Sequence, residues 1–329
     1  MTDSPADQSQ ADFSPAKRLA LVLGAGGLVG VAHHVGVLAA LEDELGFRHD
    51  QADVLIGTSA GSAVAAYLGT GWSTAQLMEM APELHRAAPG PLAGTPADFV
   101  RRGIGSAYVV ARATVRVPSV LSLPPVGWLR RAFPAGLVSM GEGSSILERD
   151  LPRSWPERQL WLAAYDLVSR CRVVLGRPGS PYMALSAAVR ASCAIPGVYA
   201  PVRAGDTMLV DGGAWSLTNV DLVALAGCEM AICVAPMAYD LARPPEGRDR
   251  LVREVATRLL ARSTERLRRL GVKVVTIAPG PAEVAVHGLN LMRATGLEAV
   301  GDVAYEETIL QLRRLRSAGE LHGLVSDSA

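Results

Sequence analysis

Short apolar runs that stop at glycine alternate with stretches of helical spacing in the first seventy residues. The run over 18–23 ends at a glycine, as a fully buried parallel strand does. Apolar residues then recur at helical spacing over 31–45. The run over 53–57 repeats the strand pattern, and the small residues of 60–68 suit a second helix. This order of strand, glycine turn and helix predicts an α/β sandwich with parallel strands.

Further strands and helices are predicted in the second half of the chain. Apolar runs that suit strands lie at 160–167, 171–176, 229–236 and 272–279. Residues 240–329 read as a helical C-terminal part, with a final helix over 303–315. The first of its helices is expected to bury an apolar stripe made by Leu251, Val255, Leu259 and Leu260.

The chain divides into a short tail and one large domain. Residues 1–16 are polar and lack the basic and apolar regions of a secretory signal, so we expect a disordered tail. Residues 17–329 are long enough for one domain with a sizeable core. Within this domain, 85–140 holds seven arginines against the single acid Asp98, a formal charge of +6. It is interpreted as a solvated loop-rich insertion or, alternatively, as a lid that meets anionic lipid.

Two stretches, 19–41 and 54–78, contain no Asp, Glu, Lys or Arg and are long enough to cross a bilayer. Both contain glycines in their middle, and the first also holds two histidines. A buried α/β core with a loop in each stretch explains this pattern better than a membrane span does. We therefore expect a soluble protein.

Composition excludes several classes of function. Acidic and basic residues balance at 32 each, which leaves no global field for nucleic acid. The four cysteines form no C-x-x-C pair and no metal-ligand spacing. So few cysteines in a long chain fit a reducing compartment, and we expect a cytoplasmic location. The sequence predicts no metal and no cofactor.

A G-x-S-x-G pentad at 57–61 falls between the second strand and its helix. Gly57 and Gly61 leave room for a sharp turn that lifts the hydroxyl of Ser59 clear of the sheet. The serine then lies at a helix N-terminus, where free N–H groups favour developing negative charge. The pattern predicts a nucleophilic serine, although a plain glycine-lined turn has the same letters.

The glycine-rich loop at 24–30 follows the first strand and exposes consecutive N–H groups, which suits an anion. One interpretation is dinucleotide binding with Glu42 or Asp43 on the ribose, but Val29 stands where that motif needs glycine. The other is an oxyanion hole for Ser59, because adjacent parallel strands bring both loops to one edge of the sheet. Only the second interpretation also explains the serine turn.

Asp211 opens a D-G-G turn after a short apolar run. Such a sequence is most often only a turn. In its functional interpretation, the bare backbone of the two glycines holds a carboxylate beside the nucleophile. That carboxylate would act as the general base.

Four blocks resemble the patatin-like phospholipase family in order and spacing: LALVLGAGGLVGVAHHVGVLAAL, LIGTSAG, RASCAIPGVYAPV and DGG, between about residues 18 and 236. The resemblance implies a three-layer α/β/α fold with a mostly parallel central sheet. It also implies acyl-ester hydrolysis of phospholipids or related lipids through a Ser–Asp dyad without a catalytic histidine. By the same resemblance, Ser59 is the nucleophile, Asp211 the base, and the N–H groups of Gly26, Gly27 and Leu28 the oxyanion hole.

The chain departs from the family pattern at two places in the glycine loop. Val29 replaces the usual basic residue and Ala25 replaces a glycine. Backbone N–H groups remain for an oxyanion, but headgroup preference and rate are left open. The proline that often follows as Asn-x-Pro is missing after Asn219, which we regard as peripheral. Two alternatives follow: a lipid-binding relative with weak or no catalysis, and a nucleotide-binding oxidoreductase that uses the glycine loop.

The histidines offer an alternative to a dyad, because His287 follows Ser59 and Asp211 in the order of an ordinary α/β-hydrolase triad. No acid-turn-histidine signature surrounds His287, so a structural role is favoured. The same holds for His33 and His34 in the first helix.

Other polar residues near the motifs are given lesser roles. Ser62 and Ser192 are not expected to be nucleophiles. Asp166, at the end of a predicted strand, either lines the site or caps a turn.

Residues 248–270 combine eight arginines and three acids with an apolar stripe. The segment either packs on the sheet or meets an anionic membrane surface together with 85–140. We therefore expect a lipid or phospholipid substrate and no nucleic acid. Peripheral contact with a membrane is left as an alternative, and the pattern does not indicate an oligomeric state.

Overall fold

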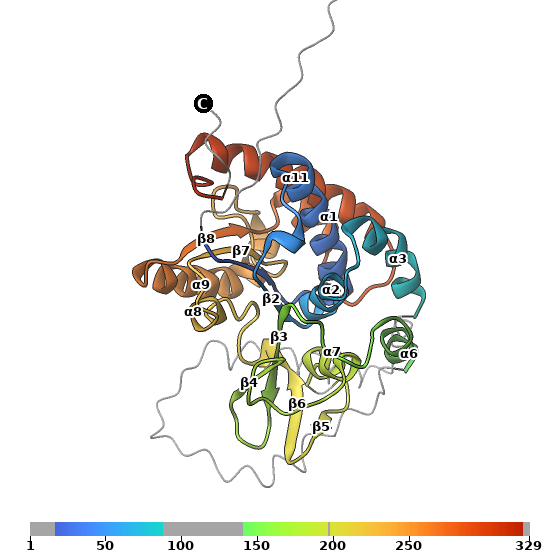
Figure 1. Cartoon of the computed structure of the whole chain (residues 1–329). Helices are drawn as coiled ribbons and strands as arrows, with labels where there is room; N and C mark the ends of the chain where they lie inside the picture. The colour runs from blue at the N-terminus through green and yellow to red at the C-terminus, as the bar shows by residue number, and fades with distance from the viewer. Residues whose placement is uncertain (1–16, 88–140, 197, 325–329) are drawn as a thin grey trace, which may run out of the picture.

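The computed structural model describes residues 17–87, 141–196 and 198–324 (Figure 1). The predicted tail and, from residue 88 on, the predicted insertion lie outside the described residues. The described ranges form one eight-stranded sheet in the order β5-β6-β3-β2-β1-β7-β8, with β4 paired to β3. Its strands are β1 (Leu19–Leu23), β2 (Val54–Thr58), β3 (Gln159–Asp166), β4 (Arg172–Leu175), β5 (Val202–Ala204), β6 (Thr207–Asp211), β7 (Met230–Val234) and β8 (Lys273–Ile277).

The sheet is mostly parallel, as predicted. Strands β3, β2, β1, β7 and β8 are parallel neighbours. Strands β4 and β6 run antiparallel to β3, and β5 runs antiparallel to β6. Leu23 pairs with Gly57 on one side and with Val234 on the other. The loops that follow β1, β2 and β7 therefore leave the sheet at one edge, which we call the carboxyl edge.

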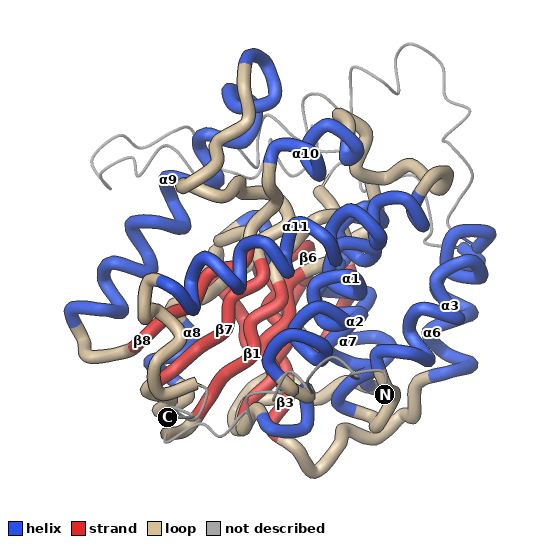
Figure 2. The backbone as a smooth tube through the Cα atoms, turned by 90° about the horizontal axis from the view of Figure 1, so that it is seen from above, coloured by secondary structure: helices blue, strands red, loops and turns tan. Residues whose placement is uncertain are grey.

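Helices cover both faces of the sheet (Figures 1 and 2). The helices are α1 (Gly27–Leu45), α2 (Ala60–Gly69), α3 (Thr74–Ala87), α6 (Gly141–Asp150), α7 (Leu185–Cys193), α8 (Leu222–Leu225), α9 (Gly247–Arg269), α10 (Pro281–His287) and α11 (Leu297–Ser317). Helix α11 packs along α1, and a Cβ on Gly36 would lie 2.2 Å from the carbonyl oxygen of Gly301. The predicted final helix over 303–315 lies within α11.

The alternation of side chains along each strand divides the core into two layers. On β1, Leu21 and Leu23 belong to a cluster that also contains residues of α1, α2 and α7. Ala20 and Val22 face the other way, into a cluster that contains Leu260 of α9. The sheet is thus buried on both faces, which explains its continuous apolar runs and confirms the α/β/α sandwich.

Helix α9 buries only part of the predicted stripe, since Leu260 is buried whereas Val255 and Leu259 are half-buried. Leu251, expected in the apolar stripe, is 74% exposed. The buried positions of the helix are Arg253, Thr257, Leu260, Thr264 and Leu267. Polar side chains enter this face because the structure supplies their partners: Thr257 Oγ1 accepts the N–H of Tyr239 at 3.1 Å. The apolar residues alone therefore define the buried face only in part.

Within the described ranges, no helix is both long and apolar enough to cross a bilayer. The uncharged stretch 19–41 instead supplies β1 and much of α1. The uncharged stretch 54–78 supplies β2, α2 and the start of α3.

Candidate active site

The G-x-S-x-G pentad forms the turn between β2 and α2. Ser59 adopts φ 54° and ψ −120°, a left-handed conformation that is strained for a residue other than glycine. A Cβ on Gly61 would lie 2.0 Å from the carbonyl oxygen of Leu23. A Cβ on Gly57 would lie 2.5 Å from the Cα of Ser62. Both glycines are thus required by close backbone contacts, as the sequence predicted for a sharp elbow.

Hydrogen bonds on both sides hold the strained backbone of Ser59. Its N–H donates to Ser192 Oγ at 3.0 Å, and Ser192 donates onward to the carbonyl of Ala163 on β3 at 2.6 Å. Its carbonyl accepts from Ser62 Oγ at 2.6 Å. Ser62 and Ser192, which were not expected to be nucleophiles, therefore support the backbone of the site. Sequence reasoning missed this role.

Asp211 ends β6 and lies next to the elbow. Its backbone pairs with Ala164 on β3, the strand adjacent to β2, and its side chain is buried. Burial raises its pKa to about 6, and hydrogen bonds from the Ser59 hydroxyl and the Gly213 N–H oppose this rise. The Gly213 N–H lies 2.7 Å from Asp211 Oδ1. A buried carboxylate thus accepts the hydrogen bond of the elbow serine.

Asn219 joins the two turns that carry these residues. Its Nδ2 donates to Thr58 Oγ1 at 3.0 Å, directly before Ser59, and lies 3.4 Å from the carbonyl oxygen of Gly212, directly after Asp211. The side chain is fully buried. Sequence reasoning noted this asparagine only for the missing proline after it and gave it no role in the site. The available signal was its position shortly after the D-G-G turn.

The glycine loop between β1 and α1 contacts the elbow directly. The carbonyl of Gly24 accepts the N–H of Gly61 at 3.1 Å and lies 2.8 Å from His34 Nε2. The two loops therefore meet at the carboxyl edge, as the parallel arrangement of β1 and β2 predicted.

Three consecutive N–H groups of this loop are available for an anion. In the part of the chain that the structure describes, the N–H groups of Gly26, Gly27 and Leu28 have no hydrogen-bond partner. The next N–H, of Val29, donates to the carbonyl of Leu291 at 3.1 Å. The free groups lie at the N-terminus of α1, where the helix dipole adds positive potential.

Val29 lies in an apolar cluster rather than in an open basic site. It is fully buried against Ala32, Leu297 and Val300. An arginine at this position would place a charge among apolar side chains. The replacement of the usual basic residue thus has a structural reason in this chain.

The nucleotide-binding alternative lacks its ribose contacts. Glu42 accepts from Thr74 Oγ1 at 2.5 Å, and Asp43 accepts from Tyr305 Oη at 2.9 Å. Both lie in the last turns of α1, about 20 Å along the helix from the glycine loop.

Asp166 caps a turn, which is one of its two expected roles: its carboxylate accepts the N–H groups of Val168 and Ser169 at 3.0 and 2.9 Å.

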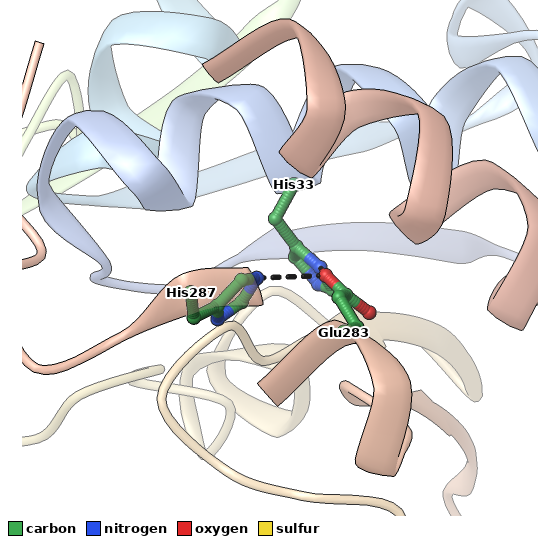
Figure 3. A group of neighbouring side chains, drawn as sticks. All are labelled: His33, Glu283 and His287. Atoms are coloured by element: carbon green, nitrogen blue, oxygen red, sulfur yellow. Dashed lines mark hydrogen bonds and ion pairs between the residues drawn. The ribbon is translucent and has the colours of Figure 1, made fainter. Parts of the chain in front are cut away.

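His287 and His33 have hydrogen-bond partners other than Ser59. His287, the alternative third member of a triad, contacts Glu283 and Arg253. His33 contacts the same Glu283 (Figure 3). Burial lowers the pKa of His34 to about 3 and that of His287 to about 4, so both are neutral at physiological pH.

The three residues of Figure 3 are also the candidate metal ligands among the described residues. One ligand atom from each of His33, Glu283 and His287 lies within 4.8 Å of the others, and all three are buried. However, Arg253 Nη2 lies 2.8 Å from His287 Nδ1 and can only donate. A metal on Nε2 would then leave His287 without a proton on either nitrogen, next to a guanidinium cation. The residues therefore fit a hydrogen-bond network better than a metal.

The fold and the site define a class of α/β proteins in which a serine lies at a sharp strand-to-helix turn, here beside a buried carboxylate. The model of one family in this class, described as patatin-like phospholipase, matches residues 21–224, which is more than half of the chain. The chain belongs to the patatin-like phospholipase family, and the resemblance seen in the four sequence blocks is confirmed. Membership implies a lipid acyl hydrolase.

Solved structures similar to this chain include VipD and the type III effector protein ExoU. VipD from Legionella pneumophila matches with a TM-score of 0.44 and 15% identity, over 95% of this chain and 72% of that chain. The type III effector protein ExoU matches with a TM-score of 0.37 and 18% identity, over 91% of this chain and 54% of that chain. The ExoU–SpcU complex from Pseudomonas aeruginosa matches with a TM-score of 0.31 and 17% identity, over 94% and 63%. The chain thus spans little more than half of the length of ExoU.

Proposed function

We propose that this protein is a serine acyl hydrolase that cleaves lipid carboxylic esters through the dyad of Ser59 and Asp211. The observation that carries the proposal is the hydrogen bond from the hydroxyl of Ser59, at its strained elbow, to the buried carboxylate of Asp211. Family membership supports the lipid ester as the class of substrate. The free N–H groups of Gly26, Gly27 and Leu28 support an oxyanion hole.

In the proposed reaction, Asp211 accepts the hydroxyl proton of Ser59 while Oγ attacks the ester carbonyl carbon. The carbonyl oxygen becomes an oxyanion that the N–H groups of the glycine loop stabilise. The alcohol leaves with the proton from Asp211, and an acyl-enzyme remains. Asp211 then deprotonates a water molecule that attacks the acyl carbonyl, and the fatty acid leaves as the hydroxyl of Ser59 is restored.

The pKa of Asp211 indicates how much of the catalysis comes from the base and how much from the oxyanion donors. An ordinary aspartate is a poor base for a serine hydroxyl, and burial improves Asp211 by raising its pKa to about 6. Most of the lowering of the activation free energy must still come from the oxyanion donors, each of which contributes roughly 3 kcal/mol in comparable sites. Buried Asp211 is mostly ionised at pH 7, so it is ready to accept the proton.

Fluorophosphonate labelling tests the dyad. The purified protein is labelled, and the modified peptide is located by mass spectrometry beside Ser59→Ala and Asp211→Asn. Asp206→Asn, in the exposed turn between β5 and β6, is the matched control. We expect labelling at Ser59 in the wild type and the control, no labelling in Ser59→Ala, and strongly slowed labelling in Asp211→Asn. Wild-type protein that does not label at Ser59 would refute the dyad.

A lipid-binding relative without turnover is the second candidate, favoured by the apolar burial of Val29. The discriminating measurement compares fatty acid release from phospholipid vesicles with vesicle binding. Binding without release, together with absent labelling at Ser59, would select this second function.

A further inference from the structure

The segment between α10 and α11, residues 288–296, lies against the glycine loop. We call it the cover segment. The carbonyl of Leu291 accepts the N–H of Val29 at 3.1 Å. A Cβ on Gly27 would lie 2.5 Å from the same carbonyl oxygen and 2.9 Å from Met292 Sδ. Gly27 also has φ +62°, so its backbone and its lack of a side chain both suit this close approach.

A chain of four buried side chains anchors this region. Arg253 on α9 donates to His287 Nδ1 at 2.8 Å, and His287 Nε2 lies 2.9 Å from Glu283 Oε1 on α10. His33 Nδ1 on α1 contacts the same Glu283 oxygen (Figure 3). All four side chains are at most 6% exposed. We call Arg253, His287, Glu283 and His33 the buried relay.

The relay has one consistent arrangement of protons. A guanidinium only donates, so His287 Nδ1 accepts and its Nε2 carries the proton that Glu283 accepts. His33 donates from Nδ1 to the same carboxylate. Burial acts to raise the pKa of Glu283, but the adjacent His33 and His287 lower it to about 2. The buried charge of Glu283 is thus balanced by donors from two other positions, and removing one donor leaves the carboxylate short of partners.

The same arginine supports the glycine loop from a second direction. Arg253 Nη1 donates to the carbonyl of Pro236 at 2.5 Å and to that of Ala238 at 3.1 Å. A Cβ on Gly26 would lie 2.8 Å from the Cβ of Pro236. Arg253 therefore connects Pro236, on one side of the glycine loop, to α10 and the cover segment on the other.

We propose that the buried relay is a positioning device that holds the cover segment and Pro236 against the glycine loop. It thereby fixes the direction of the N–H groups of Gly26, Gly27 and Leu28. His33 acts through this loop and is a positioning residue. The catalytic consequence rests on the proposed function, whereas the structural consequence does not.

The test compares His33→Leu with His33→Asn. The amide nitrogen of asparagine replaces Nδ1 and keeps the donor to Glu283, whereas leucine removes it. Leu267→Ala, a buried α9 position away from the loop, serves as the control for lost stability. Each variant is assayed at the same interval below its own Tm. The readouts are the rate of fluorophosphonate labelling at Ser59, kcat and KM for a soluble ester, and hydrogen exchange of the peptide over 24–31.

We expect His33→Leu to slow labelling and to lower kcat by about tenfold or more at a nearly unchanged KM. Exchange over 24–31 should rise in His33→Leu, and His33→Asn should stay within about threefold of the wild type in rate. Equal behaviour of His33→Leu and Leu267→Ala would overturn the proposal. If the wild type does not label at all, the proposed function fails, and exchange over 24–31 alone decides the relay. One equivalent of Zn²⁺ bound to the wild type and lost in His33→Leu would also overturn it.

Discussion

His34 Nε2 and the carbonyl oxygen of Gly24 lie 2.8 Å apart, and the His34 side chain is fully buried. Helix α1 therefore contacts the start of the glycine loop that precedes it. The same oxygen accepts the N–H of Gly61 from the elbow. One carbonyl therefore joins the proposed nucleophile turn, the proposed oxyanion loop and the helix between them. This relationship makes His34 a support for both loops.

Removal of this support should slow the reaction without affecting substrate binding. We expect His34→Leu to slow fluorophosphonate labelling at Ser59 by about tenfold, since displaced oxyanion donors act mainly in the transition state. His34→Gln, whose amide nitrogen reaches the position of Nε2, should recover most of the rate. Stopped-time labelling with peptide mass spectrometry gives both rates. Equal rates for the two variants would show that the hydrogen bond to Gly24 has no catalytic value.

The raised pKa of Asp211 predicts opposite effects of pH on reaction and on stability. Because only the ionised carboxylate accepts a proton, labelling at Ser59 should rise with pH around an apparent pKa of about 6. In the folded state burial disfavours that same ionised form. The folded pKa lies above the unfolded one, so stability is lost as pH rises through about 6.

Asp211→Asn should therefore be more stable than the wild type above pH 7. A rise of about two pKa units corresponds to roughly 3 kcal/mol. We expect the Tm of Asp211→Asn to exceed that of the wild type by about 5 °C at pH 8. The difference should vanish below about pH 3, where Asp211 is protonated in both the folded and the unfolded state. A variant less stable than the wild type at both pH values would contradict the assigned direction of the pKa shift.

Gly61 tests the steric requirement at the elbow. An alanine there would bring Cβ within 2.0 Å of the carbonyl oxygen of Leu23, so the turn or β1 must move. We expect Gly61→Ala to cost about 2 kcal/mol or more in unfolding free energy and to abolish labelling at Ser59. Gly301→Ala is the control, because its Cβ meets nothing closer than 3.7 Å and alanine suits a helix interior. Chemical denaturation of both variants gives the free energies.

Asn219 tests the link between the two turns. Loss of its buried amide should leave Thr58 Oγ1 without this donor and cost about 1–3 kcal/mol. Asn219 has φ 51°, so Asn219→Gly removes the amide without a backbone penalty, whereas Asn219→Ala adds one. We expect both variants to slow labelling equally, with Asn219→Ala the less stable in thermal unfolding. Wild-type labelling in Asn219→Gly would remove Asn219 from the site.

Helix α9 tests the predicted contact with membranes. Leu251 and Val252 are 74% and 60% exposed at its first turns, close to Arg253, which contacts the carbonyls after β7 at the carboxyl edge. Leu270 is 65% exposed at the opposite end, just before β8 begins. If the carboxyl edge meets anionic vesicles, Leu251→Gln with Val252→Gln should weaken sedimentation by about tenfold, and Leu270→Gln should not. Equal effects at both ends would exclude an oriented contact.

The elbow and the glycine loop were predictable because their causes are local. Gly57 is required by a contact within its own turn and Gly61 by a contact with the end of the neighbouring strand β1, and the apolar runs of β1 and β2 place both loops at one edge. The pairing of Asp211 with Ser59 was not local: the D-G-G turn offered it only as an alternative, and the resemblance of four blocks favoured it. The antiparallel pairing of β6 with β3, which delivers Asp211, has no signature in either strand.

The buried relay could not be predicted from sequence. Its members lie on α1, α9 and α10, and no spacing relates His33 to Arg253 or Glu283. Arg253 is an arginine in a helix rich in exposed arginines, so periodicity assigns it to solvent. Its burial is explained by the carbonyls of Pro236 and Ala238 and by His287, which accept its hydrogen bonds.

The packing of α11 along α1 has a consequence for the order in which the protein is made. A ribosome releases the glycine loop and the serine turn early, but Leu297 and Val300, which bury Val29, emerge after almost all the rest of the described chain. Until then the first helix presents an uncovered apolar face, and a nascent chain needs protection from aggregation there. Ribosome-bound chains that end before α11 should therefore bind a general chaperone, and any activity at Ser59 begins only after synthesis has passed that helix.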